Sequence, residues 1–234
     1  MSSRLLLPLA MTLPLLGCTH ASRTGHGPGH GHAHGGHAPA AMPHRFEDPQ
    51  RWSAVFDDPA RDAWQKPTEV VEALSLRPTD VVADVGAGTG YFSVRLARAV
   101  PRGRVYAVDL EPAMVHHVEH RAREAGLGNV RGVVATAASP KLPEKVDLVL
   151  IVDTYHHLED RLAWFDALRE QLRPGGRVAI VDFTMDSPHG PPPEHRVSDD
   201  QVKAEMVAAG YPTVTEPLRL PHQYLLVFSP ERRR

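Results

Sequence analysis

The stretch VVADVGAGTGYFS, residues 81–93, decides the fold of this chain. An apolar run leads to the carboxylate of Asp84, a glycine-rich turn follows, and a helical pattern begins directly after the turn. This order is typical of a buried parallel strand that passes through a tight ligand-binding turn into a helix. The stretch therefore predicts a nucleotide-like ligand at the end of this strand, and the spacing of the glycines bears on which ligand it is.

Strand-like and helix-like patterns alternate along residues 46–231, which predicts one domain over this range. Apolar runs that predict strands occupy residues 80–86, 104–110, 130–135, 146–153 and 176–183. Patterns that predict helices occupy residues 66–76, 91–100, 112–126, 158–172 and 198–210. The tail, 213–228, holds two β-like runs broken by prolines, which predict a closing antiparallel pair. We therefore expect an α/β fold with a doubly wound, mostly parallel seven-stranded sheet and an antiparallel closing strand.

Two of the predicted helices carry more specific expectations. In the helix at 158–172, apolar residues at helical spacing predict one buried side, formed by Leu158, Leu162, Phe165, Leu168 and Leu172. The helix at 198–210 begins with Ser198, and Gln201 follows three residues later, which predicts a capping box. Because open parallel sheets bind ligands at the carboxyl ends of their strands, the chemistry is expected just after Val85, Val108, Ala135, Val152 and Val181.

The glycine spacing separates two classes of ligand. Gly86, Gly88 and Gly90 follow the pattern G-x-G-x-G, one residue shorter than the dinucleotide fingerprint G-x-G-x-x-G. With Asp84 just before it, the bend suits a ligand that carries an ammonium group and no phosphate. An NAD-type oxidoreductase on a similar fold is the alternative, and the shorter spacing and the strand-pair tail argue against it.

Four motifs in order resemble those of class I S-adenosylmethionine-dependent methyltransferases. They are DVGAGTG at 84–90, VYAVDLEPAMV at 105–115, VDLVLIVDTYHHLED at 146–160 and LRPGGRVAIVDF at 172–183. The resemblance covers residues 64–228, and four motifs at compatible spacing are far more specific than one glycine loop. It implies a Rossmann-like methyltransferase fold, an enzyme, and S-adenosyl-L-methionine as the cofactor.

The predicted cofactor residues lie on three neighbouring strand ends. Asp109 ends the strand after Asp84, so its carboxylate can accept both ribose hydroxyl hydrogens. Leu110 and Met114 are expected to offer apolar surface to the adenine. The acidic residue that the family often has after its third strand is missing from ATAAS at 135–139, so Thr136 or a backbone carbonyl must substitute. The resemblance assigns the turn itself to the cofactor, through Gly86, Ala87, Gly88 and Gly90.

The loop after the fourth strand, DTYHHLED at 153–160, is expected to face the transferred methyl group. Asp153, Tyr155, His156 and His157 are the candidates there, and Asp153, His156 and His157 are the predicted catalytic residues. An imidazole with an ordinary pKa near ~6.5 is a plausible base. The alternative is that one histidine only caps or packs under the helix that follows.

A small molecule is the expected methyl acceptor. The Asn/Asp-Pro-Pro-aromatic motif of nucleic-acid amino methyltransferases does not follow the fourth strand, and the net charge of -2 gives no basic surface for nucleic acid. The proline-rich stretch 186–198 is expected to border the acceptor pocket. Its polar residues either contact the acceptor or form a solvated loop: His189, Glu194, His195 and Arg196. Upstream, Trp64 and Gln65 either cover the cofactor or, for Trp64, pack in the core.

No metal site is expected in the domain. His116, Glu119 and His120 match an inverted zinc-protease motif, but the apolar stripe of their helix places both histidines on its outer side. Asp153 and Asp182 end strands where catechol-type methyltransferases hold Mg²⁺. In those enzymes Asn follows the second Asp, whereas phenylalanine follows Asp182 here.

The first 45 residues differ from the domain. Residues 1–18 resemble a bacterial lipoprotein signal: Arg4 precedes an apolar run at 5–16, and LLGC ends at Cys18, the expected lipidation site. The alternative is an ordinary apolar N-terminus of a cytoplasmic protein. Cys18 is the only cysteine, so no disulfide can form within the chain. The signal predicts a lipid-anchored protein of the cell envelope that faces the periplasm.

Residues 19–45 form the predicted linker. Seven of the fifteen histidines lie between positions 20 and 44, among Gly, Ala and Pro, and this composition predicts a disordered segment. Histidines at this density can also bind Zn, Cu or Ni weakly. A non-enzymatic envelope lipoprotein that binds metal through this segment is therefore a further alternative.

Overall fold

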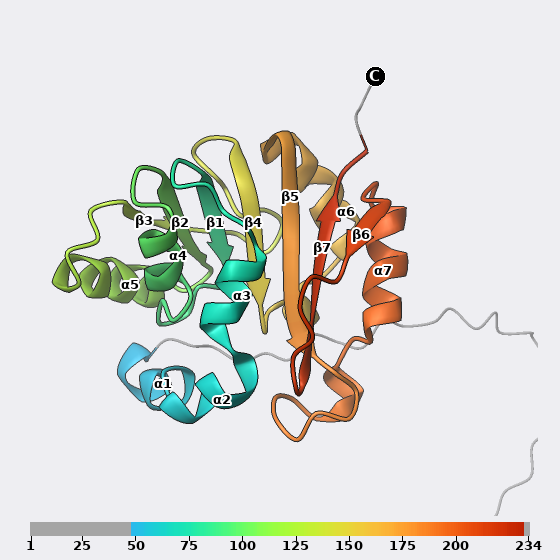
Figure 1. The fold of residues 1–234 in the computed structure, drawn as a ribbon, viewed down its shortest axis with the longest axis horizontal. Coiled ribbons are helices and arrows are strands. Elements are labelled where there is room, and N and C mark those ends of the chain that lie inside the picture. Colours follow the sequence, from blue (N-terminus) through green and yellow to red (C-terminus); the bar gives the residue numbers. More distant parts are fainter. Residues whose placement is uncertain (1–47, 232–234) are drawn as a thin grey trace, which may run out of the picture. The chain divides into compact units, whose positions relative to one another are not determined.

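The computed structural model describes residues 48–231, and these form a seven-stranded sheet with helices on both faces (Figure 1). The predicted signal at 1–18, with Cys18, and the predicted linker at 19–45 lie outside the described residues. Between residues 48 and 231 there is no helix with the length and apolar character that crossing a bilayer requires.

The sheet has the strand order β3-β2-β1-β4-β5-β7-β6, and β1 to β5 run parallel to one another. β7 runs antiparallel to both of its neighbours, β5 and β6, which confirms the predicted closing strand. The strands are β1 Val81–Val85, β2 Arg104–Asp109, β3 Val130–Val134, β4 Val146–Val152, β5 Leu172–Phe183, β6 Thr213–Thr215 and β7 Gln223–Ser229.

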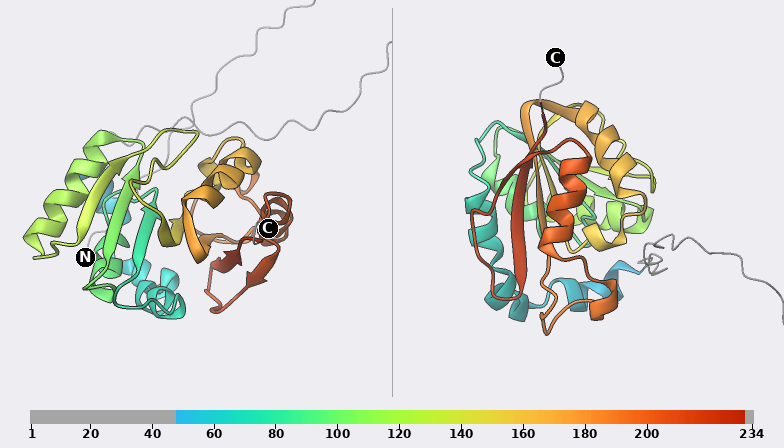
Figure 2. Two further views of the ribbon diagram at one scale, coloured as in Figure 1. Left: turned by 90° about the horizontal axis from the view of Figure 1, so that it is seen from above. Right: turned by 90° about the vertical axis from the view of Figure 1, so that its right-hand side faces the viewer.

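The predicted helices form two layers around this sheet (Figure 2). Apolar residues of α3, α4 and α5 belong to one buried cluster with one face of the sheet, and those of α6 and α7 belong to the cluster on the other face. The helices are α1 Pro49–Phe56, α2 Asp62–Gln65, α3 Pro67–Ala73, α4 Ser93–Ala99, α5 Pro112–Glu124, α6 Arg161–Leu168 and α7 Asp199–Ala208. Single 3₁₀ turns are η1 Pro59–Arg61, η2 Tyr155–His157, η3 Arg169–Gln171 and η4 Pro193–His195.

β1 is central because it pairs with β2 on one side and β4 on the other. All five of its residues are buried, as the unbroken apolar pattern of residues 81–85 requires of a strand covered on both faces. Val85 pairs with Val108 and with Ile151, so β1, β2 and β4 end at one edge of the sheet. β2 and β3 lie on one side of β1, and β4 and β5 lie on the other, so the strand order reverses between β1 and β4. Open parallel sheets hold ligands at such a switch point.

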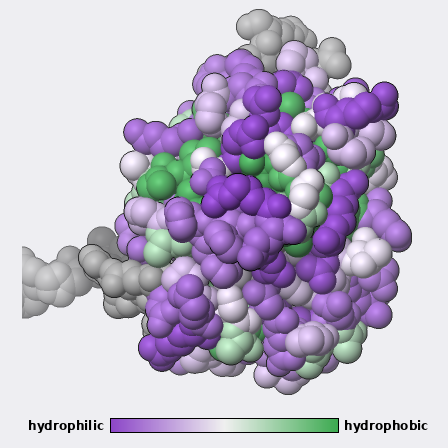
Figure 3. All heavy atoms as spheres, turned by 90° about the vertical axis from the view of Figure 1, so that its left-hand side faces the viewer, coloured by the Kyte–Doolittle hydropathy of each residue, from purple (hydrophilic) through white to green (hydrophobic). Residues whose placement is uncertain are grey.

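One edge of the sheet is less covered. No helix joins β3 to β4, and Val134 of β3 is 48 % exposed. The view onto this side shows apolar side chains within a largely hydrophilic surface (Figure 3).

The helix predicted at 158–172 is shorter than expected. Asp160 adopts a left-handed backbone (φ 38°), and its carboxylate accepts a hydrogen bond from the Ala163 amide, so α6 begins only at Arg161. Leu158 therefore lies outside the helix, and Leu162 is 52 % exposed. The prediction that both belong to the buried side was wrong for Leu162, because Trp164, Phe165 and Leu168 form the buried side of α6 and Leu162 lies off that side.

Only one of the two hydrogen bonds of the predicted capping box forms at the start of α7. Ser198 Oγ accepts a hydrogen bond from the Gln201 amide at 3.2 Å, as predicted. The Gln201 side chain instead donates to Glu205 Oε1 at 2.8 Å. The reciprocal bond of a capping box is therefore absent, because a carboxylate one turn further on attracts the Gln201 amide.

A cap of short helices, α1, η1 and α2 (residues 49–65), lies across the edge where the parallel strands end (Figure 1). β7 contributes to the same edge from the opposite direction, because Gln223 at its start pairs with Phe183 at the end of β5. The predicted site therefore lies between the strand ends and the cap.

Gly90 is required by packing. Its φ is +83°, and a Cβ there would lie 2.9 Å from Cγ1 of Val118, a fully buried residue of α5. Gly175 has a similar φ of +80°, but a Cβ at that position would meet nothing within 4 Å. The two glycines share the backbone constraint and differ in the space around them.

We expect Gly90→Ala to destabilise the protein more than Gly175→Ala. Both substitutions place a side chain on a left-handed backbone, at a cost of about 1–2 kcal/mol. The free energy of unfolding should fall by about 1–3 kcal/mol more in Gly90→Ala, because its methyl group must displace Val118. Urea unfolding followed by circular dichroism measures both, and equal losses would contradict a packing role for Gly90.

Candidate active site

A cavity of about 690 Å³ lies at the strand ends beneath the cap. Its walls come from the cap, from the turn after β1, and from the segments that follow β2, β3, β4 and β5. This is the edge at which the sequence predicted the chemistry. The volume is in the upper part of the range of ~300–1,000 Å³ typical of small-molecule sites.

The glycine turn uses its own amides internally. The amides of Gly86 and Ala87 both donate to the Val108 carbonyl, at 2.9 and 3.0 Å. The Gly88 amide donates to Asp109 Oδ2 at 2.8 Å. A Cβ at Gly86 would overlap the side chain of Thr154, so the close approach of the β4 loop requires glycine there. The turn is therefore held by β2 on one side of β1 and by the loop after β4 on the other side.

Asp109 lines the cavity at the end of β2. Its Oδ2 accepts from the Gly88 amide, and its Oδ1 accepts from the Glu111 amide at 3.0 Å. Burial raises the pKa of this carboxyl, while these backbone hydrogen bonds act in the opposite direction. A carboxylate has about four acceptor positions. Each oxygen therefore keeps capacity for one ribose hydroxyl.

Asp84 is nearly inaccessible, at 2 % exposure, yet it belongs to the cavity wall. Ser93 Oγ donates to its Oδ2 at 2.6 Å. Burial raises the pKa of Asp84 to about 7, and the hydrogen bond from Ser93 offsets only part of that effect. A cationic group nearby would favour the ionised form. The position thus suits a ligand with an ammonium or sulfonium group.

The remaining predicted cofactor residues divide into two sets. Ala87, Leu110 and Thr136 line the cavity, as predicted, and Leu110 is 56 % exposed. Met114 and Gly90 do not line it. Met114 is fully buried, because the first turn of α5 directs its side chain into the protein interior, and the prediction that it contacts adenine needs this correction. Gly90 acts through its contact with α5.

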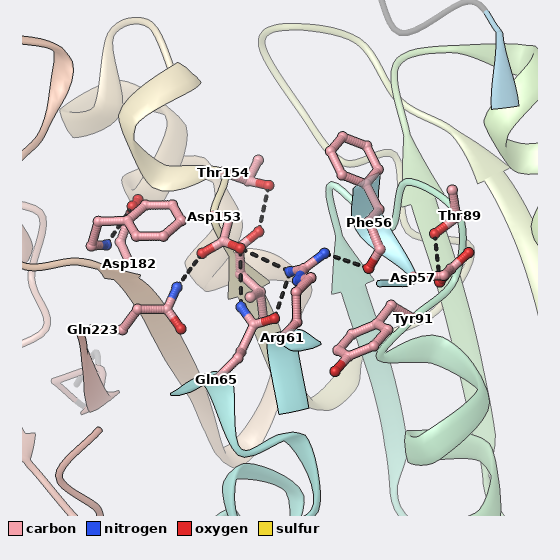
Figure 4. A network of polar contacts seen from close by, with 12 residues as sticks. Phe56, Asp57, Arg61, Gln65, Thr89, Tyr91, Asp153, Thr154, Asp182 and Gln223 are labelled. Carbon is pink, nitrogen blue, oxygen red and sulfur yellow. Dashed lines mark hydrogen bonds and ion pairs between the residues drawn. The ribbon is translucent and has the colours of Figure 1, made fainter. Parts of the chain in front are cut away.

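The cap is fastened to the sheet through Asp153 (Figure 4). Its Oδ2 accepts from Arg61 Nη2 at 3.1 Å and from Gln65 Nε2 at 3.0 Å, and Gln223 Nε2 donates to Oδ1. The Arg61 and Asp153 side chains are 14 % and 22 % exposed. Asp153 itself has a left-handed backbone, with φ 52°. Three donors engage its carboxylate, so Asp153 joins the cap to the strand ends, and its predicted catalytic role stays a prediction.

A second attachment joins the cap to the glycine turn. Arg121 Nη1 contacts Asp57 Oδ1 at 2.7 Å and donates to the Thr89 carbonyl at 3.0 Å. Thr89 Oγ1 also donates to Asp57 Oδ1 at 3.1 Å. This arrangement places Phe56 over the turn, with its ring 3.4 Å from where a Gly88 Cβ would be. Phe56, Arg61 and Gln223 were not predicted as site residues, since no local pattern marks them.

His156 and Asp182 form a buried pair beside the cavity. Nδ1 of His156 lies 3.0 Å from both carboxylate oxygens, and the two side chains are 4 % and 2 % exposed. Asp182 also accepts from the amides of Phe183 and His156, at 2.8 and 3.3 Å. Burial lowers the pKa of His156, but the hydrogen bond and the charge of Asp182 outweigh it, so the pKa lies above its ordinary value.

This pairing assigns the two ring nitrogens of His156. An ionised Asp182 only accepts hydrogen bonds, so Nδ1 carries the proton and Nε2 keeps its lone pair in the neutral ring. Among residues 48–231, no hydrogen bond to Nε2 is made. Since His156 lines the cavity, Nε2 is the basic atom available there.

The other candidates of the β4 loop differ in position. His157 lines the cavity, and its ring centre lies 4.2 Å from that of His156. Tyr155 is fully buried, and its hydroxyl donates to Glu205 Oε2 at 2.6 Å. Tyr155 therefore packs under α6, which corrects its place among the residues that face the methyl group.

Arg196 organises the proline-rich loop. Its guanidinium donates to five backbone carbonyls, those of Thr184, Met185, Ser187, His189 and Pro191. This places His189 against Trp64, with ring centres 4.5 Å apart and planes 14° from parallel. Both rings line the cavity, whereas Glu194, His195 and Arg196 do not. Of the four polar residues considered in this loop, only His189 faces the site.

Neither of the two metal-like motifs forms a metal-binding group. His116 and His120 are exposed on α5, on its outer side as predicted. Within the described part of the chain, no three His, Cys, Asp or Glu residues are grouped to hold a metal ion.

The pKa of Asp84 leads to a pH-dependent prediction. The unfolded chain loses this proton near pH ~4, but the folded protein holds it to about pH 7. The free energy of unfolding should therefore fall as pH rises through this window. Asp84→Asn has no carboxyl group to titrate at this position. Its free energy of unfolding relative to the wild type should therefore rise by about 2–4 kcal/mol between pH 4.5 and 7.5.

Urea midpoints at both pH values measure the effect. The matched control is Glu124→Gln, which removes a carboxylate that is 69 % exposed on α5. This control should keep the pH slope of the wild type. A wild-type slope in Asp84→Asn would show that the Asp84 proton is not retained on folding.

Comparison with known sequences identifies the central part of this domain. Residues 82–176 match the family described as a methyltransferase domain. A protein-L-isoaspartate O-methyltransferase of Aeropyrum pernix is 36% identical over 121 residues, which cover 50% of this chain and 44% of that protein. A ubiquinone/menaquinone biosynthesis C-methyltransferase of Teredinibacter turnerae is 30% identical over 124 residues, 52% of this chain and 49% of that protein. The chain thus spans about half the length of the curated relatives it matches.

Solved structures agree with the sequence match. A S-adenosylmethionine-dependent methyltransferase of Aquifex aeolicus superposes with a TM-score of 0.69 at 28% identity, over 77% of this chain and 97% of that protein. The superposition shows that the two proteins share the fold described above.

Proposed function

We propose that this chain, whose residues 82–176 match a methyltransferase domain, is a class I S-adenosylmethionine-dependent enzyme that transfers a methyl group to a small-molecule acceptor. The observation that carries the proposal is the placement of Asp84, the glycine turn and Asp109 on one wall of one cavity. When bound, the cofactor supplies an electrophilic methyl group on a sulfonium centre.

The residues present fit this cofactor. Asp109 has two acceptor positions free for the ribose hydroxyls, and Asp84 offers a buried carboxylate toward a cation. Leu110 and Ala87 give apolar contact surface, and Thr136 stands on the wall where the family's adenine-binding acid is missing. Each group matches one chemical feature of the cofactor, as the resemblance implied.

The same turn is unsuited to a dinucleotide. A pyrophosphate needs free backbone amides at the start of the helix. Here the amides of Gly86, Ala87 and Gly88 all donate to protein acceptors. This argues against the NAD-type oxidoreductase, the alternative suggested by the glycine pattern.

The cap supports a small acceptor. It closes the cavity from the side opposite the strands, through Arg61 at β4 and Asp57 at the glycine turn. The enclosed volume is sized for small ligands. The relatives are named for different acceptors, so their names do not identify the acceptor of this chain.

We expect Asp109→Ala to weaken binding of S-adenosylhomocysteine, the demethylated cofactor, by at least tenfold. Two charge-assisted hydrogen bonds are lost, each worth about 1.5–3 kcal/mol. Isothermal titration calorimetry measures the affinity. Asp109→Asn keeps the size and one acceptor oxygen, so its affinity should be intermediate.

The matched control is Glu159→Ala, which removes an exposed carboxylate at the rim of the same cavity. It should bind S-adenosylhomocysteine like the wild type. Circular dichroism establishes that each variant is folded. Wild-type affinity in Asp109→Ala, or no affinity in the wild type, would refute the cofactor site.

We also propose that Cys18 is lipidated and anchors the protein in the cell envelope. The support is the sequence of residues 1–18 alone: a positive residue, an apolar run and LLGC. In this arrangement residues 19–45 are a tether between the anchor and the domain, and their histidines take no part in catalysis. Because the cofactor is made in the cytoplasm, the location determines which pool of cofactor the enzyme meets.

Cell fractionation with labelled palmitate tests the anchor. The full chain should carry the label and sediment with membranes, and Cys18→Ala should lose both properties. A full-length protein that stays soluble and unlabelled would contradict the anchor. Deleting residues 19–45 should leave the affinity for S-adenosylhomocysteine unchanged in an enzyme, whereas a protein that only binds metal through this segment would lose its metal ligand.

A further inference from the structure

We infer that the methyl acceptor is a neutral, planar aromatic compound with a ring hydroxyl, and that Nε2 of His156, positioned by Asp182, receives the hydroxyl proton. This inference rests on the proposed methyl transfer and names its substrate class. It is drawn from the end of the cavity that lies away from Asp109.

Aromatic rings form the wall at this end. Trp64 stacks on His189, and its centre lies 6.0 Å from that of Phe183. Phe183 in turn is 6.5 Å from His156, which is 4.2 Å from His157. These rings come from α2, from the end of β5, from η2 and from the loop that Arg196 holds. Rings from four separate segments give a wall that favours a flat apolar ligand.

The two buried carboxylates at this end are already paired. Asp153 is bound by Arg61, and Asp182 is bound by His156. Neither carboxylate is free to bind an ammonium group, and Arg61 is not free to bind a carboxylate. An acceptor with its own charge would therefore be desolvated here without a partner, which is costly. The pairing favours an uncharged acceptor.

The available base favours a phenol over an aliphatic alcohol. Efficient proton transfer requires a base and an acid whose pKa values are not far apart. A phenol resembles the tyrosine side chain, whose pKa is about 10. The pKa of an aliphatic hydroxyl lies far higher, close to that of water. An imidazole next to a carboxylate can therefore take the proton of a phenol, but it does little for the proton of an aliphatic alcohol.

The resulting transfer balances. The phenol oxygen forms a bond to the methyl carbon as the carbon–sulfur bond breaks, and that bond's electron pair stays on sulfur. The phenol proton moves to Nε2 of His156, and the proton on Nδ1 stays in the hydrogen bond to Asp182. The new imidazolium is stabilised by the carboxylate until water takes up the proton.

A binding experiment tests the substrate class without turnover. The wild-type protein, saturated with S-adenosylhomocysteine, is titrated by calorimetry with 2-naphthol, 2-decalol and 2-naphthoate. 2-Naphthol should bind at least tenfold more tightly than 2-decalol, its saturated and non-planar counterpart, and more tightly than the charged 2-naphthoate. Equal affinities for 2-naphthol and 2-decalol, or tightest binding of 2-naphthoate, would overturn the inference.

Matched tryptophan variants locate the binding. Trp64→Leu should lose the preference for 2-naphthol, whereas Trp52→Leu, which alters a tryptophan outside the cavity wall, should keep it. Loss of preference in both variants, or in neither, would contradict the aromatic wall. The cofactor site is tested separately, because failure to bind S-adenosylhomocysteine refutes the proposed function before any acceptor is added.

A rescue experiment tests the role of His156. His156→Gln should bind S-adenosylhomocysteine normally but methylate 2-naphthol at least 100-fold more slowly. It should still methylate 2-naphthalenethiol, which loses its proton without a base. Wild-type kcat with 2-naphthol, or equal losses with both substrates, would show that His156 is not the base.

Asp182→Asn tests the positioning role. An asparagine amide can donate to Nδ1, which would move the ring proton to Nε2 and remove the base. We expect kcat for 2-naphthol to fall at least tenfold with KM nearly unchanged, and the 2-naphthalenethiol reaction to be retained. The basic group should titrate at lower pH in this variant, and an unchanged pH profile of kcat would refute the positioning role.

Discussion

The ion pair between Asp153 and Arg61 is the contact on which the enclosed site depends. It joins the cap to the end of β4, and the same carboxylate receives amides from Gln65 and from Gln223 of β7. Removing one partner would leave the other charge buried and unpaired. The free energy lost in this way is larger than the net stabilisation that the pair provides. Without this junction, Trp64 would no longer be held beside Phe183, and the aromatic wall would be lost.

The cavity has two halves that are built differently. The cofactor half consists of a turn whose amides are internally satisfied, together with two carboxylates on neighbouring strand ends. The acceptor half consists of side chains from four separate segments, which the guanidinium of Arg196 and the carboxylate of Asp182 hold in place. The first half recognises features that a whole family shares. The second half is where we expect substrate choice to be decided, if the proposed acceptor binds there.

This division explains what could be predicted from the sequence. The sheet, its closing strand and the positions of Asp84 and Asp109 followed from apolar runs and glycine spacing, which are local signals. The partners of Asp153 could not be predicted from local signals, because Arg61 reaches it from the cap and Gln223 reaches it through the antiparallel register of β7. Leu162 and Met114 were misplaced for a related reason: an apolar residue can fit the helical spacing whether its side chain turns toward solvent or into the core.

The antiparallel insertion of β7 has a consequence for biosynthesis. β7 lies between β5 and β6 and supplies Gln223, yet it is among the last described segments to leave the ribosome. Until then β5 has an unpaired edge, and one oxygen of Asp153 lacks its donor. The nascent chain can therefore form most of its parallel sheet during translation, but the pocket is complete only after β7 has been synthesised. Truncation within the final hairpin would leave an aggregation-prone intermediate in place of a slightly weaker enzyme.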